Sequence, residues 1–193
     1  MPARNPAVRV LAAEAEMMDF IFQGEAEDSN PPKYALTPSG VAANKVLLAG
    51  VVSDVTEVDN EVGTVLATLN DHSGDVTISA TQEYSPEAAK FLLDLEPPEE
   101  VMVVATIRTY ENDGELQQTI NVQEGEHGVV PQEEYDQWAY EAIEQTISRL
   151  EDLDSTEDER GPQTDPYLQY GEEDVEEVRE IVSRAIENFE ETR

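Results

Sequence analysis

The chain contains no cysteine among its 193 residues and only two histidines, His72 and His127. The absence of cysteine excludes disulfide bonds, thiolate zinc sites and cysteine nucleophiles together. Two histidines leave few groups for metal binding or acid–base chemistry. We therefore expect no metal site and no cofactor.

Basic residues are also scarce, because 11 Lys and Arg stand against 44 Asp and Glu, a formal net charge of −33. Acidity of this size without apolar periodicity is typical of disordered segments. This chain instead carries β-branched runs bounded by turn residues, so the charge coats a folded domain. Such a surface repels itself in dilute buffer, whereas at ~1 M salt the Debye length is only about 3 Å. The composition thus predicts a halophilic protein.

Long hydrophobic runs are missing too. The N-terminus lacks the basic stretch and apolar run of a signal peptide, and no segment approaches the roughly 18 apolar residues of a membrane span. We expect a cytoplasmic protein with no membrane partner. The length fits one domain of about 100 to 150 residues with appendages.

What the sequence does contain is a clear β region between about residues 34 and 123. Gly50 lies in the middle of the first long strand, which predicts a bulge or bend and a strand that serves two sheets. Asp113-Gly114 predicts a hairpin, and Ser85-Pro86 predicts the start of a short helix. The predicted strands are residues 45–57, 64–69, 75–81, 100–109 and 115–123, with the helix at 85–95 between the third and fourth strand.

This order predicts a mainly β protein with helical appendages, namely a five-stranded OB-fold barrel followed by C-terminal amphipathic helices. Before the barrel, residues 7–18 predict a short helix and residues 20–22 a strand. After it, apolar residues at helical spacing predict helices at 131–153 and 172–191, with Trp138 anchoring the first helix on the barrel. The predicted division is residues 1–32 (helix and acidic linker), 33–128 (OB-fold domain) and 129–193 (acidic helical region).

Several segments in this order resemble those of the haloarchaeal replication protein A-associated proteins, a family of OB-fold partners of the single-stranded-DNA-binding replication protein A. The matching stretches are residues 9–14 (RVLAAE), 34–40 (YALTPSG), 44–46 (NKV), 84–88 (YSPEA), 95–98 (LEPP) and 108–110 (RTY). The resemblance spans about residues 7 to 125. It implies an accessory subunit that acts on or near single-stranded DNA in replication and repair, with a replication protein A subunit as partner. Where the family places aromatic residues, residues 75–81 carry no ring.

Alternation along the strands predicts a nearly neutral outward face on this acidic chain. If Val76, Ile78 and Ala80 face the core, Thr77 and Ser79 face outward. If residues 116, 118, 120 and 122 mostly face inward, the outward residues of the last strand are Gln117, Thr119, Asn121 and Gln123. The face is either simply covered by a helix or it binds a ligand.

Candidate contacts to single-stranded DNA are rings and cations near this face, since bases stack on aromatic side chains. They are Tyr84, Arg108, Tyr110 and Lys90, together with the hydroxyls of Thr77 and Ser79. A structural role is open for each ring; Tyr84 in particular precedes the expected helix start, where a hydrophobic residue packs against the helix. Direct contact with DNA is expected to be weak or indirect.

The alternative is a protein that binds no DNA and acts as an assembly module. In that reading the amphipathic helices at 131–153 and 172–191 dock a protein partner. In both readings the apolar stripe of the last helix is expected to be free for a partner, a replication protein A subunit in the first, because a linker with Gly161, Pro162 and Pro166 loosens its tie to the barrel. The stripe consists of Val178, Ile181, Val182, Ile186 and Phe189.

Catalysis is not expected. No glycine-rich phosphate loop or nucleophile elbow is present, and Asp71, His72 and Ser73 are adjacent in one turn, where they cannot adopt the geometry of a triad. We therefore expect no catalytic residues and no small-molecule substrate.

Overall fold

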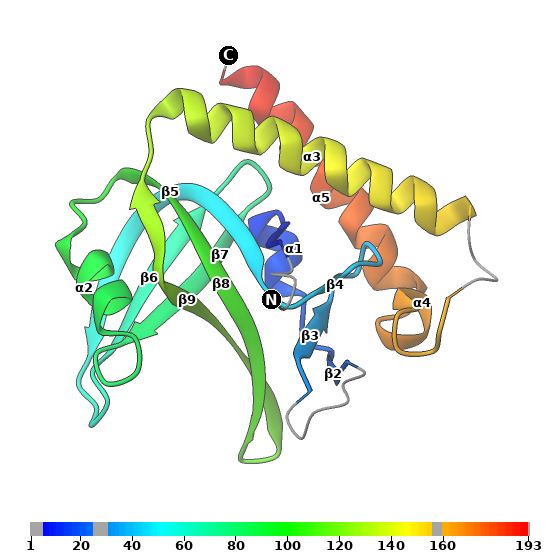
Figure 1. Cartoon of the computed structure of the whole chain (residues 1–193). Coiled ribbons are helices and arrows are strands. Elements are labelled where there is room, and N and C mark those ends of the chain that lie inside the picture. The colour runs from blue at the N-terminus through cyan, green and yellow to red at the C-terminus, as the bar shows by residue number, and fades with distance from the viewer. Residues whose placement is uncertain (1–5, 25–30, 156–159, 193) are drawn as a thin grey trace.

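The computed structural model describes residues 6–24, 31–155 and 160–192. A β domain occupies one side of the molecule, and two long C-terminal helices cross one end of it (Figure 1). A short N-terminal helix lies between the two parts (Figure 1). None of the helices in these ranges is long and apolar enough to cross a membrane.

Five long strands and one intervening helix form the β domain, in the order predicted from the sequence. They are β5 (Val46–Val58), β6 (Thr64–Asn70), β7 (Asp75–Thr81), helix α2 (Pro86–Asp94), β8 (Glu99–Asn112) and β9 (Glu115–Val129). Strand β5 pairs antiparallel with both β6 and β8. The prediction that the first long strand serves two sheets is therefore wrong, because both partners belong to the same sheet, which curves back so that β8 meets β5. Strands β7 and β9 meet in parallel at Ser79 and Asn121. The strand order is β5-β6-β7-β9-β8, and β8 returns to β5.

The expected strand count of five is too low, because four short strands precede β5 in the described residues. They are β1 (Val8–Arg9), β2 (Ile21–Gln23), β3 (Lys33–Leu36) and β4 (Ala42–Ala43). Strand β1 pairs parallel with β5 and widens that sheet to six strands, while β2, β3 and β4 form a separate sheet of three.

The N-terminal helix is also shorter than predicted, since only α1 (Ala12–Glu16) is helical. Its start is fixed by the loop between β6 and β7. The Ala12 N–H donates to Asp71 Oδ2 at 2.7 Å, and the Ala13 N–H donates to Ser73 Oγ at 3.1 Å. These bonds satisfy helix N–H groups that would otherwise lack partners. Asp71 and Ser73 therefore have a structural role as caps of α1.

Gly50 is required by a close approach of two strands. A Cβ atom at this position would lie 2.3 Å from the backbone oxygen of Asn70. The predicted bulge at Gly50 is misplaced, because the register shift between β5 and β6 falls between Val52 and Asp54. The glycine at position 50 is thus explained by the close approach of the Asn70 backbone, and the bulge lies a few residues later in β5.

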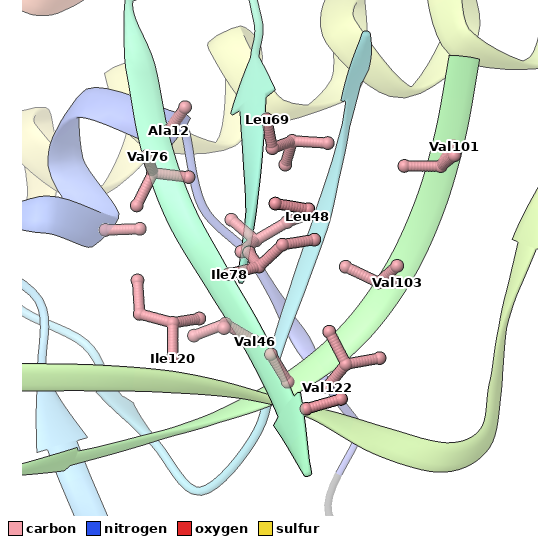
Figure 2. Packing of buried hydrophobic residues seen from close by; sticks show 14 of the residues in the cluster. Ala12, Val46, Leu48, Leu69, Val76, Ile78, Val101, Val103, Ile120 and Val122 are labelled. Atoms are coloured by element: carbon pink, nitrogen blue, oxygen red, sulfur yellow. The ribbon is translucent and has the colours of Figure 1, made fainter. Parts of the chain in front are cut away.

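The main core lies inside the β domain. Inward side chains of all five long strands meet there, and Ala12 of α1 closes one end (Figure 2). Its labelled members on the strands are Val46, Leu48, Leu69, Val76, Ile78, Val101, Val103, Ile120 and Val122. Alternate burial along β6, with Val65, Ala67 and Leu69 buried, confirms the period of two seen in the sequence.

A second core joins the C-terminal helices to the outside of the β domain. The helices are α3 (Gln132–Ser155), α4 (Pro166–Gln169) and α5 (Glu172–Glu191). Helix α3 lies across the domain, and α5 crosses behind α3 in the view of Figure 1. Trp138 of α3 is only 2% exposed and packs in the same cluster as Leu47 and Ala49 of β5, which confirms the predicted anchor.

A buried ion pair ties α3 to the N-terminal segment. Arg149 Nη2 lies 3.1 Å from Glu14 Oε2, and the two side chains are 9% and 0% exposed. Arg149 also donates to Ser39 Oγ, to Thr146 Oγ1 and to the Arg9 carbonyl, while Glu14 Oε1 accepts from the Ser39 N–H. Both buried charges thus have partners, as buried ions require.

Candidate nucleic-acid interface

One outward face runs across β6, β7, β9 and β8, and its alternate residues carry few charges. Strand register places Thr68 opposite Thr77, Thr106 opposite Asn121, and Arg108 opposite Thr119. Two exposed acids border this face: Asp75 lies two residues before Thr77 on β7, and Asp54 of β5 lies opposite Thr68. We define the strand face as Leu66, Thr68, Thr77, Ser79, Thr106, Arg108, Tyr110, Gln117, Thr119, Asn121 and Gln123. Only Arg108 among these residues is charged at neutral pH.

Polar side chains of the strand face bind one another. Ser79 Oγ donates to the Ile120 carbonyl at 3.2 Å and lies 3.2 Å from Asn121 Oδ1. Asn121 Nδ2 in turn donates to Thr119 Oγ1 at 3.0 Å. Ser79 is only 7% exposed, so its predicted place as a solvent-facing contact is wrong. The reason is that β7 and β9 join at Ser79, and its hydroxyl is used in that junction.

Arg108 and Tyr110 lie side by side on the strand face, where β8 and β9 continue as a hairpin away from the rest of the domain (Figure 1). Arg108 Nη1 donates to the Ile107 carbonyl at 3.0 Å, and no carboxylate pairs with Arg108 among the described residues. Tyr110 is 48% exposed, and its hydroxyl donates to Gln117 Oε1 at 2.8 Å. The ring is therefore fixed at one end and open to solvent. An oriented ring next to an unpaired guanidinium suits stacking and phosphate contact.

Tyr84 and Lys90 lie elsewhere. Tyr84 follows the C-terminal end of β7, and Lys90 lies on α2 just after it. Tyr110 is opposite Gln117, which precedes the point where β9 meets β7 at Asn121 and Ser79. Tyr84 and Tyr110 therefore lie on opposite sides of this β7–β9 junction. Tyr84 is 73% exposed, so packing of its ring against the helix is excluded. A hydrogen bond with the adjacent Glu83 raises the pKa of the Tyr84 phenol. The structure therefore brings Thr77, Arg108 and Tyr110 to one face but leaves Tyr84 and Lys90 apart.

The loop between β5 and β6 borders an acidic groove of about 800 Å³. Glu57, Asp59, Glu61 and Glu83 line it. Like charge disfavours a phosphate backbone there, so the neutral strand face is the better candidate for nucleic acid.

The stripe predicted to bind a partner is part of the second core. Val178, Ile181, Val182 and Phe189 are buried, and Ile186 packs against the same cluster. The expectation that this stripe is free for a partner is wrong. Side-chain hydrogen bonds hold α5 in place, because Arg184 donates to the Ser73 carbonyl and Asn188 to the His72 carbonyl, each at 2.8 Å. The preceding linker is tied down as well, since the Tyr170 hydroxyl donates to the Leu36 carbonyl.

No protein-family model matches the chain, and no curated protein sequence matches it significantly. Solved structures do. One chain in the crystal structure of the Schizosaccharomyces pombe Stn1–Ten1 complex superposes with a TM-score of 0.55 at 12% identity, over 78% of this chain and 96% of that chain. This likeness supports an OB-fold-like architecture.

Two further solved structures match with lower TM-scores. A chain of yeast Stn1 and Ten1 gives 0.47 at 9% identity, over 77% of this chain and 76% of that one. The small single-stranded DNA-binding protein from Streptomyces coelicolor gives 0.26 at 15% identity, over 45% of this chain and 93% of that one.

Proposed function

We propose that this protein is an accessory OB-fold subunit that works with replication protein A on single-stranded DNA in replication and repair. The strand face is the DNA contact, with Tyr110 as the stacking ring, Arg108 as the phosphate contact and Thr77 beside them. The observation that carries the proposal is an unpaired cation beside an exposed ring, on a strand face with few acids in a chain of net charge −33.

Acidity does not oppose this function in concentrated salt. Counterion release strengthens the binding of basic proteins to DNA, but its contribution to affinity falls steeply as salt rises. Stacking of a base on an aromatic ring contributes ~1 to 3 kcal/mol to the free energy of binding, as measured by alanine substitution. A site built on one ring and one guanidinium is therefore suited to binding that survives molar salt.

The association with replication protein A is supported by the resemblance of residues 7 to 125 to its associated proteins. The fold likeness to a chain of the Stn1–Ten1 complex is consistent with an OB-fold protein that works in an assembly. The α5 stripe cannot be the surface for this partner, nor for the alternative, a module that only assembles with other proteins, because that stripe is buried.

DNA binding can be tested by fluorescence anisotropy with labelled oligo-dT of about 15 nucleotides, within the range of OB-fold site sizes. In about 2 M KCl, Tyr110→Ala should raise the Kd by roughly 5- to 150-fold, the equivalent of ~1 to 3 kcal/mol. Arg108→Gln should weaken binding less than Tyr110→Ala does. It should also reduce the slope of log K against log salt concentration by about 0.7, the value for one phosphate contact on a single strand.

Tyr84→Ala is the matched control, since it removes an even more exposed ring from a distant place. It should leave the Kd unchanged. If the wild-type chain does not bind oligo-dT, or if Tyr84→Ala matters and Tyr110→Ala does not, the strand face is not the site. Association with replication protein A is tested separately, by co-elution of the purified proteins in size-exclusion chromatography at molar KCl; independent elution would contradict it.

A further inference from the structure

An open groove lies where α3 begins, on the outside of the β domain. Its volume is about 490 Å³, and Met102 of β8, Pro131 and Trp138 supply its apolar lining. Arg9 lies at one side, with its Nη2 atom 2.6 Å from Glu141 Oε2. The groove is separate from the strand face, because none of the strand-face residues lines it.

Two side chains that line this groove each carry a buried N–H group without an acceptor. Trp138 Nε1 and Arg9 Nε are both buried, and neither has a hydrogen-bond partner among the described residues. An unpaired buried N–H is unfavourable, and native proteins avoid it unless another molecule supplies the acceptor. Two of them in one groove point to a ligand that brings oxygen acceptors.

Charge at the groove decides between ligands that carry such oxygens. Glu133, Glu134 and Glu141 line it, against Arg9 as the one cation, which is already paired with Glu141. A phosphate backbone offers acceptors but is repelled by this rim. A peptide backbone offers carbonyl acceptors without charge, and basic side chains on it are attracted by the rim.

We infer that this groove binds an extended, basic segment of a partner protein. An apolar side chain of the segment rests on Met102 and Pro131, its carbonyl groups accept from Trp138 and Arg9, and its Lys or Arg side chains pair with Glu133 and Glu134. Small movements of the lining side chains open the two N–H groups to the segment. The inference does not depend on DNA binding.

Trp138 makes the test direct because it is the only tryptophan of the chain, so the spectrum contains one indole N–H signal. The experiment selects a phage-displayed library of random linear decapeptides on the full-length protein at molar KCl, then titrates the enriched peptides into ¹⁵N-labelled protein. The inference predicts enrichment of Lys or Arg next to an apolar residue. It also predicts a downfield shift of the Trp138 indole N–H and a change in its fluorescence.

Variants separate binding from folding. Trp138→Phe keeps a ring but removes the N–H, and it should weaken the selected peptides about five- to tenfold, as loss of one hydrogen bond does. Because Trp138 also anchors α3 in the second core, this variant should melt at a lower temperature, and its binding is measured where circular dichroism shows that it is folded. Glu133→Gln with Glu134→Gln should weaken them a few-fold. The matched control, Glu144→Gln, changes an exposed charge of α3 outside the groove and should have no effect.

Four results would overturn the inference. They are the absence of enriched peptides, enrichment of acidic peptides, enriched peptides that leave the Trp138 signal unchanged, and an indole shift that depends on protein concentration alone. The last result would assign the groove to a second copy of this chain.

Discussion

Removal of Arg149 tests the junction between the C-terminal helices and the β domain. Arg149→Met leaves Glu14, which is 0% exposed, as a buried carboxylate without its cation, and it also removes donors to Ser39 and Thr146. Solvent cannot screen the remaining charge. Breaking one partner of a buried pair costs about 3 to 5 kcal/mol, so the free energy of unfolding should fall by that amount.

The assay is urea denaturation followed by circular dichroism at fixed molar KCl, which keeps surface repulsion constant. Glu14→Gln combined with Arg149→Met removes both charges, and it should recover most of the loss because no unpaired ion stays buried. Arg179→Met is the control: its partners Asp154 and Glu176 are exposed, and an exposed pair contributes at most about 1 kcal/mol. A loss below about 1 kcal/mol for Arg149→Met, or a double variant as unstable as the single one, would refute this reasoning.

Three further predictions concern stability. Because the net charge of −33 repels itself in dilute buffer, circular dichroism should show loss of structure there and recovery in molar KCl; a salt-independent melting temperature would contradict the halophilic interpretation. Burial lowers the pKa of His72 in the folded protein, and nearby Asp136 opposes this shift only in part. As the pH falls, His72 is therefore protonated in the unfolded chain before it is protonated in the folded one, and stability should fall as the pH drops below about 6.5. His72→Phe, which keeps a ring stacked on Tyr135, should reduce that fall between pH ~7.5 and ~5.5, and an unchanged pH profile would exclude His72 as its source. Gly50→Ala should cost about 1 to 3 kcal/mol or more in urea denaturation because its Cβ meets the Asn70 backbone, whereas Gly128→Ala, with open space around it, should not; equal effects would show that the close approach is absent.

The sequence alone determined the features that depend on neighbouring residues. Alternation of apolar side chains predicted the strands 64–69 and 75–81, which the structure has at 64–70 and 75–81, since a period of two is a local property of the chain. Ser85-Pro86 marked the start of α2 for the same reason, because helix starts depend on residues within one turn. The order of these elements was enough to predict an OB-fold-like arrangement, and alternation predicted an outward face with Arg108 and Tyr110 near it.

Tertiary structure decided which surfaces are free. An apolar stripe predicts that a helix buries one face but not what covers it, so Phe189 of α5 was assigned to a partner although it packs within the chain's own second core. Ser79 is similar, because alternation makes it outward-facing, and only the junction of β7 with β9 buries it. Arg149 and Glu14 are 135 positions apart, and no local pattern pairs them. Their contact exists because the chain brings α3 back onto its N-terminal segment, where two charges removed from water require one another.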